Sequence, residues 1–547
     1  MARQKTTIGK YLLDELYRRG IRDIFGIPGD YVLGFYEELE KHRIRRVGTT
    51  REDSAGFAAD AYARVRGLGA VCVTYCVGGF NLVNPVAGAY AEKSPVVVIS
   101  GAPGMKERES NPLLHHCVRD FSTQREIFEK ITVASASLED PLTAFHEIDR
   151  VLNAVEHYKR PGFIEIPRDM VDMAQVHRSA LNGNVFPEDA DALKECMTEV
   201  TEMLNNSKRP VILAGVEVHR FGMQDALVEF VEKSKFPVAS TLLGKSVISE
   251  HHPLYLGVYE GAMGRSQVQR IVENSDCVLM LGCFMTDINL GVFTANLDSK
   301  RAISATTEKI SIRRHHYEGI SFEGFMRELL NLKIRRRRKP NVPADDHVWC
   351  NGVKDDSKIS IRSLFGELNR FITEDMVVIS DIGDCLFGAV DLKIHRRTEF
   401  LSPAYYASMG FGVPAALGAQ TAAPHLRPVV LVGDGAFQMT GMELSTCVRH
   451  GLNPIVVVLN NHGYSTERQI MDGPFNDVNE WAFHRVPELL GSGWGFTVET
   501  VGDLRQALQA SLANRDSFSI LDVNLDAYDM SPALERLGER MGKNIKS

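Results

Sequence analysis

The strongest constraint on the fold of this chain is a series of short apolar segments that recurs along its length. Most are rich in Val and Ile, each is bounded by Gly, Pro, Asn or Asp, and amphipathic helical patterns lie between them. They are residues 71–77, 95–101, 210–215, 277–282, 376–383, 427–435 and 453–461. Such segments are typical of strands buried on both faces of a parallel sheet. The sequence therefore predicts an α/β protein with parallel sheets flanked by helices.

The length of the chain predicts more than one hydrophobic core. It has 547 residues, and domains average about 150 residues. We predict domains over residues 1–180, 195–335 and 359–547, with a linker over residues 336–358. The arginine run Arg335–Arg338 is also typical of nucleic-acid binding. Because no aromatic residues interleave it and no second basic segment exists, we interpret it as solvated linker and expect no nucleic-acid partner.

Composition excludes several classes of protein. The net charge of −8 gives no general attraction to nucleic acid or anionic membranes. No apolar run reaches the roughly 18–20 residues that a membrane span needs. The first ten residues lack the apolar core of a signal peptide, so we expect a cytoplasmic protein. Nine cysteines without any Cys-x-x-Cys spacing predict reduced thiols.

Residues 427–461 carry the most specific pattern. A strand is predicted to end at Val432, followed by a tight Gly-Asp-Gly turn. Residues 439–451 fit a helix, and the next strand ends at Asn460 and Asn461. Because ligands of open α/β sheets bind at the carboxyl ends of the strands, we expect Asp434 and Asn461 to lie side by side on one such edge.

These two side chains predict a metal site. Carboxylate and amide oxygens suit Mg²⁺ or Ca²⁺ rather than zinc, and Mg²⁺ commonly takes further oxygens from phosphates. The small residues Gly435 and Ala436 would let a diphosphate approach the start of the following helix. Taken alone, the Gly-Asp-Gly motif and the Asn-Asn motif are each also compatible with an ordinary turn. Their spacing, filled by one helix and one strand, favours a Mg²⁺–diphosphate clamp.

The pattern resembles the metal–diphosphate signature of thiamine diphosphate enzymes. From residues 25–31 to residues 472–477, essentially the whole chain resembles the 2-oxo-acid decarboxylases that act on pyruvate, indolepyruvate, phenylpyruvate and branched-chain substrates. The resemblance implies the thiamine diphosphate-binding fold, with pyrimidine-binding and diphosphate-binding domains around a middle domain. It implies thiamine diphosphate and Mg²⁺ as cofactors.

The resemblance also assigns cofactor contacts. The metal would be held by Asp434, Asn461 and the backbone carbonyl of Gly463. Met409 would prop the cofactor in a bent shape, and the Ala407 carbonyl would accept from its aminopyrimidine. The full set of implied cofactor contacts is Glu52, Asp384, Ala407, Met409, Asp434, Gly435, Ala436, Asn461 and Gly463.

The implied reaction is the nonoxidative decarboxylation of a 2-oxo acid to an aldehyde and CO₂, through a thiamine diphosphate ylide and an enamine. The thiazolium ring would be the electron sink. Glu52 would activate the cofactor, and Asp30, His115, His116 and Glu467 would transfer protons. Each of these residues alone could be a turn, cap or solvated residue. Their order and context match the decarboxylases.

The resemblance further implies a substrate pocket and an assembly. The pocket would include Ile288, Leu386, Thr466 and Ile470. Pyruvate-specialised members carry bulkier groups near Leu386 and Thr466, so we expect a larger substrate, either aromatic or long or branched aliphatic. Two subunits would form each active site of a homodimer, and two dimers a homotetramer.

Three other functions are compatible with parts of the sequence. A carboligase or acetohydroxyacid synthase-like transferase would use the same cofactor, but the histidine pair and Glu467 favour decarboxylation. A Rossmann dehydrogenase would explain the α/β pattern, yet the glycine motif at residues 409–418 follows no convincing strand. An inactive scaffold that binds nucleic acid would rest on the arginine run alone.

Overall fold

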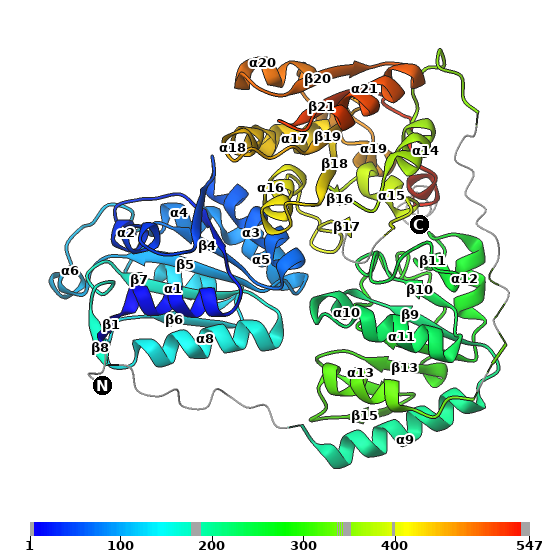
Figure 1. The fold of residues 1–547 in the computed structure, drawn as a ribbon, viewed down its shortest axis with the longest axis horizontal. Coiled ribbons are helices and arrows are strands. Elements are labelled where there is room, and N and C mark those ends of the chain that lie inside the picture. The colour runs from blue at the N-terminus through cyan, green and yellow to red at the C-terminus, as the bar shows by residue number, and fades with distance from the viewer. Residues whose placement is uncertain are drawn as a thin grey trace.

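The computed structural model consists of three α/β domains, each built around its own sheet (Figure 1). It describes residues 5–176, 188–335, 352–395 and 400–537, together with residues 337, 338, 340 and 342. The predicted α/β class with parallel sheets flanked by helices is confirmed. Much of the predicted 336–358 linker lies outside the described residues.

The first domain is a parallel six-stranded sheet in the order β3-β2-β4-β5-β7-β6. Its strands are β2 (Asp23–Gly26), β3 (Arg45–Gly48), β4 (Gly69–Val73), β5 (Val96–Ala102), β6 (Ala134–Ser137) and β7 (Gly162–Pro167). Its helices are α1 (Ile8–Arg18), α2 (Leu33–Glu40), α3 (Glu52–Arg66), α4 (Val77–Asn81), α5 (Val83–Ala91), α6 (Met105–Ser110), α7 (Thr123–Glu129) and α8 (Ala144–Tyr158). Strands β1 (Lys5–Thr7) and β8 (Ala174–Val176) form a separate antiparallel pair.

The middle domain has a seven-stranded sheet in the order β11-β10-β9-β12-β13-β14-β15, in which only the last two strands are antiparallel to their neighbours. Its strands are β9 (Pro210–Ala214), β10 (Val238–Ser240), β11 (Tyr255–Val258), β12 (Cys277–Leu281), β13 (Ala302–Ala305), β14 (Ile310–Ile312) and β15 (His315–Tyr317). Its α-helices are α9 (Ala190–Asn206), α10 (Val216–Arg220), α11 (Gln224–Ser234), α12 (Ser266–Glu273) and α13 (Phe322–Asn331).

The third domain repeats the parallel architecture in the order β17-β16-β18-β19-β21-β20. Its strands are β16 (Met376–Ser380), β17 (Phe400–Leu401), β18 (Arg427–Gly433), β19 (Ile455–Asn460), β20 (Trp494–Val498) and β21 (Ser519–Asn524). Its α-helices are α14 (Ile361–Phe371), α15 (Asp384–Val390), α16 (Gly412–Ala422), α17 (Asp434–Thr440), α18 (Leu444–Arg449), α19 (Ser465–Ile470), α20 (Val486–Leu490) and α21 (Val501–Ala513).

Two details of the predicted β-α-β unit are wrong. The chain enters α17 directly at Asp434, so Gly-Asp-Gly is a strand end and a helix start, not a separate turn. The single helix predicted over residues 439–451 is instead α17, a 3₁₀ turn over Gly441–Glu443 and then α18. An added Cβ at Gly441 would lie 2.4 Å from the Phe437 ring, so the break lets the backbone pass close to that ring.

Close packing of α3 against α16 joins the first domain to the third. An added Cβ at Gly418 of α16 would lie 2.0 Å from the Ala58 carbonyl of α3, so the two backbones are in direct contact. Arg64 of α3 makes two hydrogen bonds to Asp60 and donates to the Ser402 carbonyl of the third domain. One apolar core runs through both domains, whereas the middle domain has cores of its own.

A buried carboxylate lies where the middle domain meets the third. Glu260 is 1% exposed, and neither of its carboxylate oxygens meets a hydrogen-bond donor among the described residues. Burial, and then the charge of Asp391, raise the pKa of Glu260 to about 7, against opposing effects of Arg536 and Lys245. Glu260 therefore stays protonated in the fold at pH values where the unfolded chain ionises it.

This shift predicts a pH-dependent stability. A raised carboxyl pKa contributes stability that is present below the ordinary value of 4.5 and is lost as the pH rises through about 7. Glu260→Gln keeps the shape of the protonated acid and cannot ionise. We expect it to raise the melting temperature on the order of 2 °C at pH 8 and to leave it unchanged at pH 4.5. Equal effects at both pH values in a thermal unfolding series would contradict this explanation.

Candidate active site

The ends of two neighbouring strands bring Asp434 and Asn461 to one cavity. Strands β18 and β19 are parallel and paired, with Gly433 opposite Leu459. Asp434 starts α17 directly after β18, and Asn461 directly follows β19. Both side chains are buried and line a cavity of about 70 Å³. The juxtaposition expected from the sequence is therefore present.

The side chains of Asn460 and Asn461 make different contacts, because successive residues along a strand point to opposite faces of the sheet. Asn460 donates from Nδ2 to the Asp522 carboxylate at 2.9 Å, which joins the ends of β19 and β21. Asn461 lines the cavity instead.

The carboxylate of Asp434 is held by backbone N–H groups. Gly435 donates to Oδ1 at 2.6 Å and Gly463 donates to Oδ2 at 3.0 Å. Burial raises the pKa of Asp434, and these N–H groups together with the charge of His462 oppose the rise. A cation beside this carboxylate would favour its ionised form.

The cavity fits a metal ion with a phosphate group. Asp434 and Asn461 supply hard oxygen donors. An added Cβ at Gly433 would meet no atom of the described residues within 4 Å, so the strand end leaves open space. The hydroxyl of Thr466 is buried in the cavity wall without a hydrogen-bond partner among the described residues, so a bound group could supply one. These donors and this space suit Mg²⁺ and a diphosphate.

Not all of the remaining third-domain residues expected at the cofactor line the cavity. Met409, Gly435, Ala436 and Glu467 line the same cavity. Ala407 has a positive φ of 58°, which turns the chain sharply before Met409. Asp384 lines the cavity, but its carboxylate accepts hydrogen bonds from the backbone N–H and hydroxyl of Ser531, which was not expected. Burial raises the pKa of Asp384 to about 6.

Asp381 is a site residue that sequence reasoning missed. It is fully buried and accepts hydrogen bonds from the N–H groups of Gly410 and Gly412. Burial raises the pKa of Asp381 to about 6. This carboxylate fixes the turn that follows Met409. Its position one residue after β16, at the same sheet edge as Asp434, was the available signal.

In the first domain, three of the expected proton-transfer groups form one cluster. Ligating atoms of Asp30, His115 and His116 lie within 4.8 Å of one another, and His115 Nε2 lies 2.8 Å from the Asp30 carboxylate. The Tyr31 ring stacks on His115 with 5.0 Å between ring centroids. His116 Nδ1 is buried without a hydrogen-bond partner in the described part of the chain. This arrangement can pass a proton between imidazole and carboxylate.

Glu52 is the first residue of α3. Its carboxylate accepts a hydrogen bond from Asn81 Nδ2 at 2.9 Å and is only half-buried. Just before it, Thr50 donates from its backbone and hydroxyl to Glu443 of the third domain. The chain just before α3 is therefore hydrogen-bonded to the third domain.

The two groups of residues do not meet within one chain. Asp30 and the histidine pair flank α2 and α6 at one side of the molecule, whereas α15 and α19, which line the cavity, lie at the other side (Figure 1). The expected pocket residues are also divided. Thr466 lines the cavity, Leu386 belongs to an apolar cluster against which Ile288 of the middle domain packs, and Ile470 is half-buried at the end of α19.

Comparison with known families identifies the chemistry. Three family profiles match the chain: the N-terminal TPP binding domain of thiamine pyrophosphate enzymes at residues 6–126, their central domain at 197–332 and their C-terminal TPP binding domain at 381–523. A protein of Azospirillum brasilense named indole-3-pyruvate decarboxylase is 38% identical over 541 residues, which is 97% of each chain. The chain belongs to the thiamine diphosphate-dependent 2-oxo-acid decarboxylases.

Other relatives support the same family. Proteins named alpha-keto-acid decarboxylase from Mycobacterium tuberculosis (strain H37Rv) and Mycobacterium avium (strain 104) are each 33% identical, over 97% of this chain and 96% of theirs. This enzyme is thus a 2-oxo-acid decarboxylase with thiamine diphosphate as cofactor. Among its described residues all cysteines are free thiols, and no helix there is long and apolar enough to cross a membrane.

Because Asn460 and Asn461 make different contacts, substituting each in turn tests whether Asn461 binds the metal. Asn461→Ala removes an oxygen donor from the cavity, so we expect the Kd of thiamine diphosphate in the presence of Mg²⁺ to rise about 10- to 100-fold. Asn460→Ala removes the bond to Asp522, so it should lower the melting temperature and change that Kd less than about twofold. Calorimetric titration of both variants measures this, and equal losses of affinity would contradict the assignment of Asn461.

Proposed function

We propose that this enzyme converts larger 2-oxo acids, aromatic or branched, into the aldehyde and CO₂, in active sites that two copies of the chain form together. Its membership of the decarboxylase family supplies the reaction class. The separation of Asp30 and its histidines from Asp434 and Asn461 in one chain carries the proposal of a shared site.

In this proposal Asp434, Asn461 and the carbonyl of Gly463 hold Mg²⁺, and the metal holds the diphosphate of the cofactor. Two features of the described residues support this placement: the open space at Gly433 and the Thr466 hydroxyl, which has no hydrogen-bond partner among them. The thiazolium ring of the bound cofactor takes up the electron pair that CO₂ leaves behind. Met409 and the Ala407 carbonyl orient the cofactor above the cavity.

Glu52 holds a proton at the pyrimidine end of the cofactor. A carboxyl group acts as an acid near neutral pH when it is desolvated. In one chain Glu52 is only half-buried. A partner copy that covers it would supply the desolvation that this role requires, and this supports a homodimer as the active unit, with a dimer of dimers as the expected assembly.

Asp30, His115, His116 and Glu467 move protons at the carbon that loses CO₂ and at the oxygen of the departing aldehyde. The short contact between His115 and Asp30 supports a relay between imidazole and carboxylate. Glu467, an exposed residue at the cavity, would approach this cluster from the partner copy.

The preference for larger substrates rests on side-chain volume near the cavity. Leu386 and Thr466 are smaller than the groups expected in pyruvate-specialised members, and Ile288 packs against the apolar cluster that contains Leu386. The name of the Azospirillum brasilense relative, an indole-3-pyruvate decarboxylase, also supports an aromatic substrate. An apolar pocket discriminates by about 1–3 kcal/mol per methylene, so the preference is graded.

A panel of 2-oxo acids tests this preference. With thiamine diphosphate and Mg²⁺ present, we expect kcat/KM for phenylpyruvate or indole-3-pyruvate to exceed that for pyruvate by about tenfold or more, with free aldehyde as the product. Thr466→Ile adds bulk to the cavity wall and should lower kcat/KM for the aromatic acids about tenfold while sparing pyruvate.

Thr466→Val is the matched control because it keeps the volume of threonine and removes only the hydroxyl. It should retain the aromatic preference. A clear preference of the unsubstituted enzyme for pyruvate would overturn the proposed substrate class, and an acyloin as main product would favour the carboligase reaction.

A further inference from the structure

We propose that Glu165 is a positioning residue for the decarboxylation, because it holds both ends of the segment that carries His115 and His116. This inference rests on the proposed role of the two histidines. The side-chain hydrogen bonds of Glu165 go to Arg108, Gln124 and Ser137 and not to the histidines, so it would act through the two helices that flank their segment.

The segment over residues 111–122 has little regular support of its own. It connects α6 to α7, forms no helix or strand, and most of its side chains are exposed, including Leu113 and Val118. The hydroxyl of Tyr31 donates to the His115 carbonyl at 3.2 Å, and that of Tyr75 to the Asp120 carbonyl at 3.4 Å. Such a segment keeps one conformation only if its ends are fixed.

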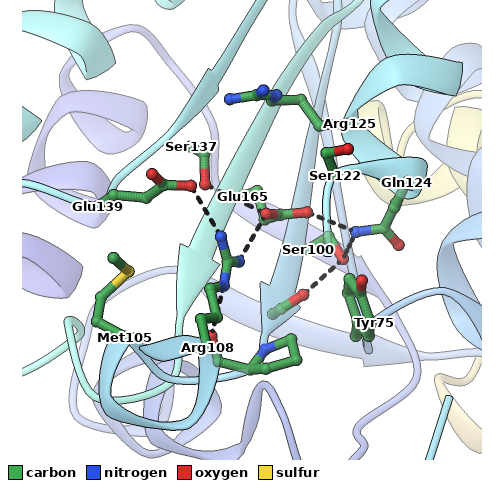
Figure 2. Close-up of polar contacts among 12 residues, drawn as sticks. Tyr75, Ser100, Met105, Arg108, Ser122, Gln124, Arg125, Ser137, Glu139 and Glu165 are labelled. Atoms are coloured by element: carbon green, nitrogen blue, oxygen red, sulfur yellow. Dashed lines mark hydrogen bonds and ion pairs between the residues drawn. The ribbon is translucent and has the colours of Figure 1, made fainter. Parts of the chain in front are cut away.

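Glu165 fixes both ends from a buried strand. It lies on β7 and is 1% exposed. Its Oε1 accepts a hydrogen bond from Arg108 Nη2 at 2.9 Å and one from Ser137 at 3.2 Å. Its Oε2 accepts from Gln124 Nε2 at 3.0 Å. Arg108 belongs to α6, before the histidine segment, and Gln124 to α7, after it, so one carboxylate closes the loop (Figure 2).

Gln124 also connects Glu165 to the region of Glu52, the residue proposed to activate the cofactor. Gln124 Oε1 accepts from the backbone N–H of Cys76 at 2.7 Å, where the chain has a positive φ of 49° before α4. An added Cβ at Gly79 would lie 2.2 Å from this Oε1, so glycine permits the contact. Helix α4 ends at Asn81, which donates to Glu52. Gln124 thus supports both the histidine segment and the partner of Glu52.

The chemistry of the network requires a carboxylate at residue 165. Burial raises the pKa of Glu165, and the charge of Arg108 with the hydrogen bonds from Arg108, Gln124 and Ser137 opposes this rise. Every neighbour named here is a donor. An amide in place of the carboxylate would turn its NH₂ group toward the donor of Arg108 or that of Gln124, and one end of the segment would lose its acceptor.

Glu139 provides a matched control on the same arginine. Its carboxylate accepts from Arg108 Nη1 at 2.8 Å, but it is 43% exposed and makes no contact with Gln124 in the described structure. Exposed ion pairs contribute little, whereas loss of one partner from a buried pair is costly. Glu139→Gln therefore removes the negative charge from an Arg108 contact, while the amide oxygen can still accept from Arg108 and the segment stays closed.

The experiment compares Glu165→Gln with Glu139→Gln in the holoenzyme. For Glu165→Gln we expect amide hydrogen exchange in residues 109–123 to accelerate about tenfold or more. We expect kcat to fall about 10- to 100-fold, because displaced catalytic groups lose their alignment. The Kd of thiamine diphosphate should rise much less than in Asn461→Ala, since the metal site lies in another domain and only the support of Glu52 is affected. Glu139→Gln should match the unsubstituted enzyme in all three measurements.

A reversed hydrogen bond provides the rescue. In the double variant Glu165→Gln with Gln124→Glu, the amide at 165 can accept from Arg108 and donate to the carboxylate at 124. Recovery of slow exchange and of kcat above the level of Glu165→Gln supports the proposal. If Glu165→Gln does not fold, Arg108→Lys tests the same closure, because a single ammonium group cannot reach Glu165, Glu139 and the Pro103 carbonyl together.

Two results would overturn the proposal. One is a Glu165→Gln enzyme with unchanged exchange in residues 109–123 or with kcat within twofold of the unsubstituted enzyme. The other is a His116→Ala enzyme that keeps full kcat while Glu165→Gln loses it, because Glu165 would then act by another route. The first result leaves the proposed function intact if His116→Ala is inactive, so the two failures can be distinguished.

Discussion

The backbone contact between α3 and α16 is the constraint on which the rest of the structure depends. Gly418 lies so close to the Ala58 carbonyl that any larger residue would separate the helices. Close-packed helices of this kind leave no room for one domain to rotate against the other without loss of packing. The first and third domains share one core, and the residues proposed for proton transfer and for the metal lie on elements at different sides of the chain. A decarboxylase site that needs both groups is then incomplete in a single copy.

Three buried carboxylates hold segments that carry proposed site residues. Asp381 anchors the turn after Met409, Asp434 holds the loop at Gly463, and Glu165 closes the histidine segment. Desolvation raises the pKa of each carboxyl group, so these positions are unfavourable without their donors. The fold uses strand ends and short helices to supply those donors from the backbone and from neighbouring segments. Hydrogen bonds to these buried carboxylates thus hold the proposed site segments in place, in addition to the packing of the apolar core.

The sequence predicted features that depend on local patterns of residues. It did not predict features that depend on contacts between residues far apart in the chain. Apolar segments predicted the parallel sheets, and the spacing of Asp434 and Asn461 predicted their meeting, since both follow from strand periodicity alone. The break in the helix at Gly441 was not predicted, because it depends on the Phe437 ring packing against the backbone. The hydrogen bond from Ser531 to Asp384 was not predicted either, because the two residues are 147 apart in the sequence. Glu165 is unremarkable in its strand sequence, and only the convergence of Arg108 and Gln124 gives it a role.

The most direct test of the shared active site is complementation between two variants that are each inactive. Glu52→Gln and Asp434→Asn chains with different affinity tags are produced together, and the mixed dimers are isolated by both tags. If each site takes Glu52 from one copy and Asp434 from the other, each mixed dimer holds one intact site and should recover about half of the unsubstituted specific activity. Mixed dimers as inactive as either parent would show that one chain supplies both residues to the same site, and would contradict the account.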